Sequence, residues 1–195
     1  MTEQRIGRQT PTRSYFVPYE KTKGKEASDY YRRTKRTPHE WQCLLLDDIM
    51  AVNDDGLWAH SKVGYSVSRR NGKNEIIAMR EQWGLLNGEH ILHTAHRTQT
   101  SHTAWERLCL LLDDLGVEYK ATKQLGNESI VVEGGGRANF RTRSAKGGLG
   151  EGYDLLIIDE AQEYTSDQES SLKYVVSDSQ NPQTLMCGTP PTAVS

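Results

Sequence analysis

An apolar run that ends in two carboxylates is the feature that most restricts how this chain can fold. Residues 155–158 are Leu-Leu-Ile-Ile, and Asp159 and Glu160 follow directly. A strand that is apolar on both faces must be covered on both faces, which is typical of a parallel sheet with helices on each side. Ligands bind at the carboxyl ends of the strands in such open α/β sheets. The run therefore predicts an α/β fold with Asp159 and Glu160 at the ligand-binding edge.

A strand-to-helix turn with a basic loop lies about 85 residues earlier. Residues 62–67 alternate and are rich in β-forming side chains, whereas the sequence from residue 74 has helical apolar spacing. Backbone N–H groups in such a loop can hold phosphate oxygens at the positive end of the helix dipole, and a lysine can reach the outer phosphates. The loop consists of Ser68, Arg69, Arg70, Asn71, Gly72 and Lys73.

The loop departs from the standard phosphate-binding pattern G-x-x-x-x-G-K-[S/T] at two positions. Val67 stands where the pattern has glycine, and valine disfavours the positive φ that glycine permits. Asn74 replaces the serine or threonine that binds magnesium, so only its amide oxygen is available to the metal or to a metal-bound water. Taken alone, the loop also fits a basic surface turn.

The two carboxylates complete a pattern for nucleotide hydrolysis. One carboxylate is needed to hold magnesium and a neighbouring one to orient and deprotonate the attacking water. Asp159 fits the first role and Glu160 the second. A solvated acidic cap after the strand explains the pair equally well when it is taken alone. The loop and the acidic pair together, in this order, predict a nucleotide hydrolase.

The chain of 195 residues alternates helical and strand patterns, which predicts one P-loop NTPase-type domain with a mostly parallel sheet flanked by helices. A capping box, Thr37 to Glu40 with Pro38 at the first helical position, opens a helix to about residue 52. A hairpin is expected from residues 129–133 and 139–143. Further expected elements are a helix from residue 74, strands at 90–95, 155–158 and 183–188, a partly helical stretch at 160–178, and a helix at 100–115 that Gly116 ends.

Charge divides the chain at about residue 36. Residues 1–36 hold ten Lys and Arg against four Asp and Glu, whereas residues 37–195 hold 14 against 22. The first segment mixes proline, glycine and basic residues without a regular period, so we expect a flexible basic arm ahead of an ATPase domain at 37–195. Such an arm can bind DNA phosphates, although a charge run is more often only solvated.

The remaining composition indicates the compartment. Cys43, Cys109 and Cys187 are isolated and odd in number, which favours a reduced cytoplasm over a disulfide scaffold. No signal-peptide pattern opens the chain and no run of 18 apolar residues occurs, so the expected location is the host cytoplasm. A zinc site at His90, His93 and His96 is not expected, because side chains alternate along a strand and His93 faces away from the other two.

Five motifs in order resemble the large terminases of tailed bacteriophages, over about residues 37–191. The loop SRRNGKN is similar to their deviant Walker A loop, in which an arginine follows a small residue, as Arg69 follows Ser68. Their Walker B motif and its extension resemble DEAQ at 159–162, and their coupling motif resembles LMCGTP at 185–190. TPHEWQ at 37–42 is similar to their adenine-recognising segment, and HTAHRTQTSHTAWERL to the segment after their second strand.

The resemblance implies a role for several residues. Lys73 and the Gly72 backbone would hold phosphates, within a nucleotide-binding set that also includes Ser68, Arg69, Arg70, Asn71 and Asn74. Asp159 and Asn74 would bind magnesium, and Glu160 would be the catalytic base. Gln42 would contact adenine, and Thr189 would sense the γ-phosphate. Arg69 would stabilise transition-state charge within the subunit, and Arg143 is a second candidate, in a glycine-rich loop, that would reach a neighbouring site.

The resemblance also implies ATP and Mg²⁺ as cofactors, double-stranded DNA, a portal protein and a small terminase subunit as partners, and a homo-oligomeric ring. Large terminases continue beyond the coupling motif into further ATPase strands and a nuclease domain, so an incomplete ATPase sheet without a nuclease is expected here. Two alternatives stay open. A helicase-like DNA-dependent ATPase also has an Asp-Glu-Ala-x box, although Gly188-Thr189 favours the packaging motor. A nucleotide-binding module without turnover is the other.

Overall fold

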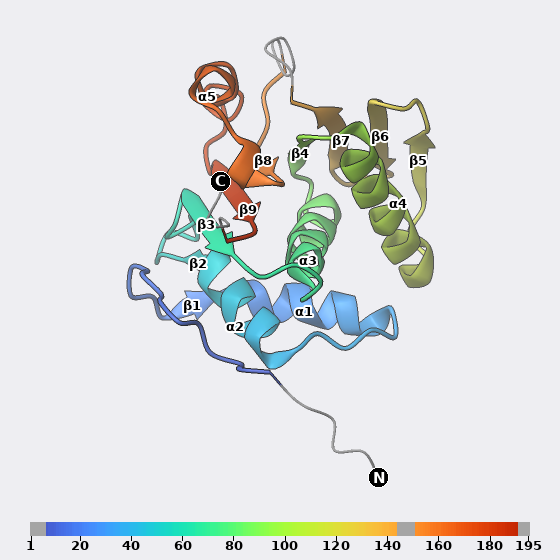
Figure 1. Ribbon diagram of the computed structural model, residues 1–195. Coiled ribbons are helices and arrows are strands. Elements are labelled where there is room, and N and C mark those ends of the chain that lie inside the picture. The colour runs from blue at the N-terminus through green and yellow to red at the C-terminus, as the bar shows by residue number, and fades with distance from the viewer. Residues whose placement is uncertain (1–6, 144–150, 191–195) are drawn as a thin grey trace.

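The computed structural model describes residues 7–143 and 151–190 as an α/β domain (Figure 1). Every strand and helix expected after residue 37 is present, with small shifts at the ends. The elements are β1 (Lys21–Thr22), α1 (Gly24–Arg33), α2 (Glu40–Ile49), β2 (Ala51–Val52), β3 (Lys62–Ser66), α3 (Lys73–Leu86), β4 (His90–Ala95), α4 (Thr98–Leu115), β5 (Tyr119–Thr122), β6 (Asn127–Val132), β7 (Arg137–Thr142), β8 (Leu155–Ile158), the 3₁₀ turn η1 (Ala161–Glu163), α5 (Ser166–Leu172) and β9 (Gln183–Gly188).

A seven-stranded sheet in the order β3-β9-β8-β4-β7-β6-β5 forms the centre of the domain. The strands from β3 to β7 in this order are parallel, whereas β6 is antiparallel to both β7 and β5. All four residues of β8 are buried, as its apolar run predicts. The parallel arrangement brings the carboxyl ends of β3, β8 and β9 to one edge of the sheet. Within the described ranges, β3 is an edge strand.

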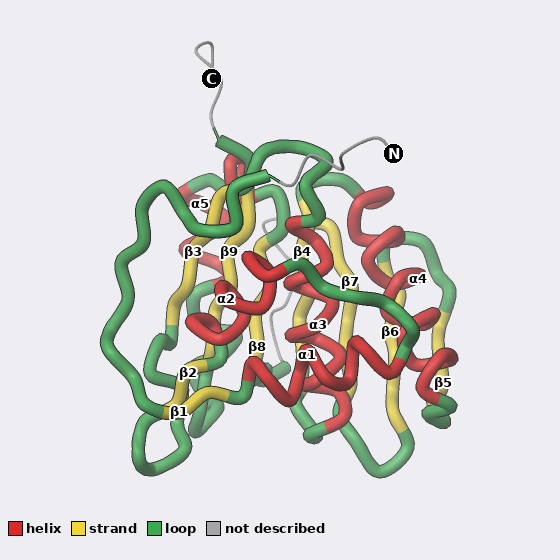
Figure 2. Tube along the Cα trace, turned by 90° about the horizontal axis from the view of Figure 1, so that it is seen from below, coloured by secondary structure: helices red, strands yellow, loops and turns green. Residues whose placement is uncertain are grey.

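Two hydrophobic clusters cover the two faces of the sheet. The larger one joins α1, α2, α3 and α4 to the sheet, and Figure 2 shows these helices in front of the strands. The smaller one includes Leu156, Ile158 and Met186 from the strands, with Leu172, Val175 and Val176 from α5 and the segment after it. Among the described residues, no helix is long and apolar enough to cross a membrane.

The expectation of an irregular arm over residues 1–36 is wrong for residues 24–33, which form α1. The helix is mostly polar and charged, and only two strongly apolar positions, Ala27 and Tyr31, face the core from it, at 0% and 5% exposed. The helix packs closely on α2: a Cβ on Gly24 would lie 2.7 Å from the Asp47 Cα. Glu26 accepts a hydrogen bond from the Trp83 indole of α3 (2.9 Å). Tertiary contacts thus make α1 part of the domain.

The second helix differs from its predicted bounds at both ends. It begins at Glu40, after His39 as N-cap, because the Gln42 side chain accepts a hydrogen bond from the His39 N–H (2.8 Å) in place of the predicted Thr37–Glu40 pairing. It ends at Ile49 instead of about residue 52, because Ala51 and Val52 pair with β1. The edge strand β5 was not predicted, since it is short and mostly exposed.

Candidate active site

The loop between β3 and α3 forms a cradle at the carboxyl edge of the sheet. Gly72 caps α3 in the left-handed conformation (φ 79°), and Arg70 is also left-handed (φ 64°). The Asn71 amide donates to the carbonyls of Ser68 and Arg69 (3.2 Å each), which ties the loop to itself. The first N–H groups of α3 therefore face the space above the sheet, where a helix attracts anions.

Val67, which occupies the position of a glycine in the standard pattern, extends the strand instead of entering the loop. Its N–H donates to the Gly188 carbonyl of β9 (3.1 Å), so the pairing of β3 with β9 continues one residue beyond the strand. The turn begins only at Ser68, and the left-handed residues come later, at Arg70 and Gly72. Val67 itself therefore does not need the positive φ that would require a glycine at this position.

Lys73 joins the loop to the acidic end of β8. Its Nζ lies 2.8 Å from Asp159 Oδ1 and 2.8 Å from Asn74 Oδ1. Burial by itself lowers the Lys73 pKa, but the neighbouring Cys187 and Asp159 overcome this effect and raise it. Asn74 also donates to Asp159 Oδ2 (3.2 Å). The structure thus brings together Lys73, Asn74 and Asp159, as the two sequence motifs predict.

Cys187, which was not predicted as a site residue, completes the surroundings of Asp159. Its thiol donates to Asp159 Oδ1 (2.9 Å), and its side chain is fully buried on β9. Burial raises the pKa of this thiol, so it stays protonated and acts as a donor. The sequence signal for it is weak, because only its place beside the Gly-Thr-Pro segment relates it to the site.

Glu160 follows Asp159 in a left-handed backbone conformation (φ 55°, ψ 48°) that is sparsely populated by residues other than glycine. Its N–H donates to Asp159 Oδ1 (2.8 Å), so the two acidic residues form one compact turn. In the described part of the chain, Glu160 Oε2 is buried and has no hydrogen-bond partner. The carboxylate lines the pocket above the loop.

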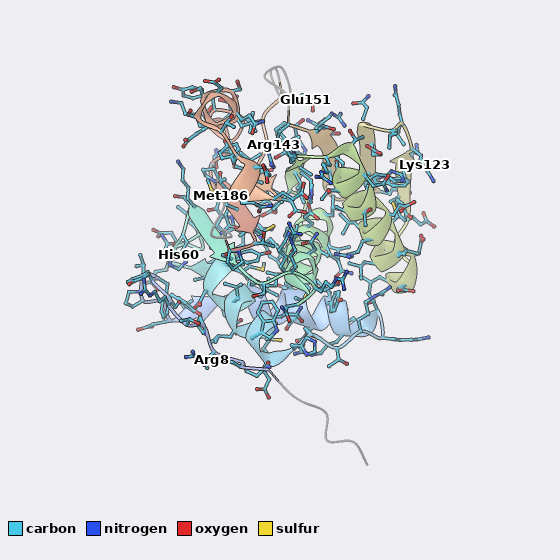
Figure 3. All side chains as sticks on the ribbon, viewed as in Figure 1. Arg8, His60, Lys123, Arg143, Glu151 and Met186 are labelled. Atoms are coloured by element: carbon cyan, nitrogen blue, oxygen red, sulfur yellow. The ribbon has the colours of Figure 1, made fainter. Side chains whose placement is uncertain are left out.

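Arg143, labelled in Figure 3, does not extend toward a neighbouring subunit as expected. Its guanidinium donates to the carbonyls of Thr94 (3.3 Å), Asp159 and Glu160 (3.1 Å), and the residue is only 7% exposed. The expectation placed Arg143 in a mobile loop, but the ladder between β4 and β7 continues to it, with the Arg143 N–H on the Ala95 carbonyl. The rest of the glycine-rich loop, at 144–150, lies outside the described residues.

Gln42 lies next to the loop but not in the pocket. Its Nε2 donates to the Gly72 carbonyl (3.0 Å), its Oε1 accepts from the His39 N–H, and it is 3% exposed. Both the amide nitrogen and the amide oxygen are therefore hydrogen-bonded to main-chain groups. The expected contact with adenine would require Gln42 to give up one of these bonds, whereas its position makes it a support of the loop.

The pocket over the loop has a volume of about 610 Å³. Predicted residues line most of its floor, and the segment after β4 and helix α4 adds residues that had no predicted role. Of these, Arg97 makes no ion pair in the described structure, and Arg107 pairs with Glu75 (3.4 Å). The lining residues are Ser68, Arg69, Arg70, Gly72, Lys73, Asn74, Glu75, His96, Arg97, Thr100, Arg107, Glu160, Gln162, Glu163 and Thr189.

Thr189 lies at the rim of this pocket, directly after β9. Its N–H donates a hydrogen bond to Gln162 Oε1 (3.2 Å), and Gln162 belongs to the turn after Glu160. The segment after β9 is thus joined to the acidic turn through a side chain of the DEAQ motif. Gln162 was not predicted as a site residue, although the motif contains it.

The three histidines of the β4 region take three different positions. His93 is buried, stacks on Phe140, and lies 2.7 Å from the Glu81 carboxylate. Burial alone lowers the His93 pKa, but the charge of Glu81 and its hydrogen bond overcome this and raise it. His90 is exposed and His96 lines the pocket. Among the described residues, no group of three or more His, Cys, Asp or Glu is arranged to hold a metal.

The parallel sheet, the loop from β3 to α3 and the acidic turn after β8 define a fold of the P-loop NTPase type. No protein-family model matches the sequence, and no curated protein matches it. Solved structures that resemble it include large terminases of bacteriophages and their ATPase domains, which cover most of the chain. The domain therefore has the fold of a phage large-terminase ATPase domain.

Three of these structures illustrate the likeness. The large terminase of bacteriophage HK97 matches with a TM-score of 0.71 and 14% identity, over 86% of this chain and 38% of that one. The ATPase domain of the Thermus phage P74-26 large terminase matches with a TM-score of 0.62 and 16% identity, over 84% and 69%. The large terminase of a thermophilic bacteriophage, in complex with ADP, gives 0.57 and 13%, over 89% and 39%. The chain thus spans well under half of two of these proteins.

Proposed function

We propose that this chain is the ATP-hydrolysing part of a motor that packages double-stranded viral DNA. The observation that carries the proposal is the contact between Lys73 Nζ and Asp159 Oδ1 (2.8 Å), in which Lys73 lines a pocket of about 610 Å³ and Asp159 is buried behind it. It joins the helix N-terminus that would hold phosphates to the carboxylate that would hold a metal. The fold shared with a large terminase in complex with ADP supports a nucleotide as the ligand.

The phosphates of ATP would lie on the loop and on the first turn of α3. The first N–H groups of a helix have no partner within it, so those at the start of α3 could bind phosphate oxygens, and Lys73 would exchange its carboxylate partner for these oxygens. Arg69 and Arg70 line the same pocket and form no ion pair in the described structure, so both are available to a polyanion. Arg69 is our candidate for stabilising charge in the transition state.

The residues around Asp159 suit a magnesium ion. Both Asp159 oxygens and the Asn74 Oδ1 already contact cationic or N–H groups, and Mg²⁺ prefers oxygen ligands of these kinds, completed by water and substrate phosphates. Asp159 is fully buried, and although burial raises its pKa, the charges of His93 and Lys73 and the Cys187 hydrogen bond lower it overall. It is therefore ionised at neutral pH. Bound magnesium would neutralise charge on the phosphates.

Glu160 is the group that would accept a proton from the attacking water. Glu160 lines the pocket, and its Oε2 is buried without a partner in the described part of the chain, so a water bound there would give this oxygen the hydrogen bond that it lacks. The Gln162 bond to Thr189 would pass a change at this turn to the segment after β9. Portal protein, small terminase subunit and a ring of identical subunits are the partners that such a motor would have, with DNA in the channel.

The first test compares ATP hydrolysis by the wild-type chain and by Glu160→Gln, with magnesium and with or without double-stranded DNA. We expect Glu160→Gln to lower kcat by roughly 10²-fold or more, the usual worth of a general base, while the Kd for ATP stays within about twofold. Glu163→Gln is the matched control, because Glu163 lines the same pocket three residues further on. A variant that loses binding and turnover equally would contradict the role of Glu160, and binding without wild-type turnover would favour a nucleotide-binding module.

A further inference from the structure

The backbone turn at Glu160 needs an explanation, because a glutamate is held in a conformation that side chains rarely adopt. Its φ of 55° and ψ of 48° place it in the left-handed region. Residues in such conformations persist only where the surrounding structure holds them. The conformation matters for the site, since it determines where the carboxylate of Glu160 points, and that carboxylate lines the nucleotide pocket.

Arg143 contacts this turn from the opposite side. Its Nη1 donates to the carbonyls of Thr94 (3.3 Å) and Asp159, and its Nη2 donates to the Glu160 carbonyl (3.1 Å). One planar guanidinium thus binds the carbonyl before Glu160 and the carbonyl of Glu160 itself. It also joins both of them to the Thr94 carbonyl of β4. Arginine suits this task because its donors have a fixed geometry, whereas a lysine ammonium is a single point.

The surroundings of Arg143 agree with a fixed position. The residue is 7% exposed and is absent from the lining of the nucleotide pocket, and the Tyr164 ring lies 5.8 Å from its Cζ. Within the described ranges, its Nε is buried without a partner. A charge is costly to bury in this way, so the three carbonyl contacts must compensate for the lost hydration. An arginine that served a neighbouring subunit's nucleotide would instead need an exposed guanidinium.

We propose that Arg143 is a positioning residue that holds the peptide units around Glu160 in the left-handed turn and thereby aims the Glu160 carboxylate into the pocket. The inference rests on the ATPase function proposed above. It assigns Arg143 to its own subunit's site, in which it touches neither nucleotide nor water and acts only through the main chain of Asp159 and Glu160.

The test replaces Arg143 by Gln and by Lys. We expect Arg143→Gln to lower kcat by roughly 10²-fold, the effect of a displacement of about 1 Å in a catalytic group, with KM and the Kd for ATP changed by less than about threefold. Arg143→Lys should recover only part of the rate. Arg141→Gln is the matched control: it lies on the same strand, and its guanidinium also donates to two main-chain carbonyls, those of Glu128 and Phe140, remote from the turn.

A second measurement does not depend on turnover. The backbone ¹³C chemical shifts of Glu160 distinguish a left-handed residue from other conformations, so they should change in Arg143→Gln and stay unchanged in Arg141→Gln. Shifts that stay left-handed in Arg143→Gln would overturn the proposal, even if the wild-type chain has no measurable ATPase activity. Wild-type turnover that Glu160→Gln does not lower would count against the proposed function instead.

A mixing experiment separates a role within the subunit from a role in a neighbour. Arg143→Gln protein is combined with Glu160→Gln protein, each inactive alone. If Arg143 served a neighbouring site, the second protein would supply the arginine to the first, whose Glu160 is intact, and activity would return. We expect no recovery, because Arg143 and Glu160 must belong to the same chain. Recovery would contradict the proposal.

Discussion

Among the residues of the site, Asp159 is surrounded by four donors: the Lys73 ammonium, the Asn74 amide, the Cys187 thiol and the Glu160 N–H. A fully buried carboxylate would be unfavourable without them, because burial disfavours the charged form. Burial raises the Asp159 pKa, but the charges of His93 and Lys73 and the hydrogen bonds from Cys187 and Lys73 together lower it below its ordinary value. The stability that this carboxylate contributes is therefore present above the unfolded pKa of an aspartate and is lost as the pH falls through its folded pKa.

His93 gives a pH dependence of the opposite sign. Its raised pKa means that the folded protein binds a proton more tightly than the unfolded chain does, with Glu81 as its partner and Asp159 and Arg143 also acting on it. This contribution to stability is fully present below the ordinary histidine pKa of about 6.5 and is lost as the pH rises through the folded pKa. The free energy of unfolding of His93→Gln should therefore fall below that of the wild type by more at pH 6 than at pH 9.

Urea unfolding curves at several pH values measure this difference, and His90→Gln controls for the loss of a histidine from the same strand. A difference between wild type and His93→Gln that is independent of pH would contradict the proton uptake.

At the scale of elements, the loop between β3 and α3 is supported from outside its own strand and helix. Gln42 of α2 donates to the Gly72 carbonyl, and the Tyr65 hydroxyl of β3 donates to the Lys73 carbonyl (2.9 Å). Tyr31 of α1 donates to Glu75 in the first turn of α3 (2.5 Å), which in turn pairs with Arg107 of α4. The first turn of α3 is thus held by three other helices and by the strand that precedes it.

The Gln42 contact leads to a prediction that separates loop support from base recognition. Gln42→Met should destabilise the fold by about 1–3 kcal/mol, because it removes both hydrogen bonds of a buried side chain, the one to the Gly72 carbonyl and the one from the His39 N–H. It should weaken ATP and GTP binding by the same factor, since the loop holds the phosphates of both. Loss of the preference for ATP over GTP would instead show that Gln42 reads adenine. Gln168→Met is the control, because Gln168 has the same capping position at α5.

At the scale of the whole molecule, the basic N-terminal segment is divided between a helix that is part of the core and residues that lie on the surface. Ala27 and Tyr31 of α1 are buried against the other helices, so deletion of residues 1–36 would remove core side chains together with positive charge. Exposed basic side chains that can be neutralised without this loss include Lys25, Arg33 and Lys35.

We expect the triple variant Lys25→Gln, Arg33→Gln and Lys35→Gln to weaken binding to double-stranded DNA and to reduce the slope of log K against log salt by about 3, if each residue contacts one phosphate. Fluorescence anisotropy at several salt concentrations measures the slope. The charge-matched control neutralises three exposed lysines on other elements, Lys62, Lys120 and Lys173. An unchanged slope would mean that these three side chains do not bind DNA.

The amino-acid sequence by itself determined the α/β class, the order of the main elements and the position of the loop and the acidic pair at the carboxyl edge of the sheet. These depend on local information: an apolar run must be buried, alternating strands and helices give parallel strands, and parallel strands bring their carboxyl ends to one edge. The chemistry of that edge follows from the residues next to it, which is why the sequence predicts one site for the loop and the acidic pair.

Only the tertiary structure decided what α1, Gln42, Cys187 and Arg143 do. Each acts through partners that are far away in the sequence: Glu26 binds Trp83, Gln42 binds Gly72, and Cys187 and Arg143 bind Asp159 or its main chain. Sequence patterns report periodicity and local turns, but they do not say which distant carbonyl a side chain will reach. A mostly polar helix becomes stable, and a basic residue becomes buried, only through contacts that the folded chain creates.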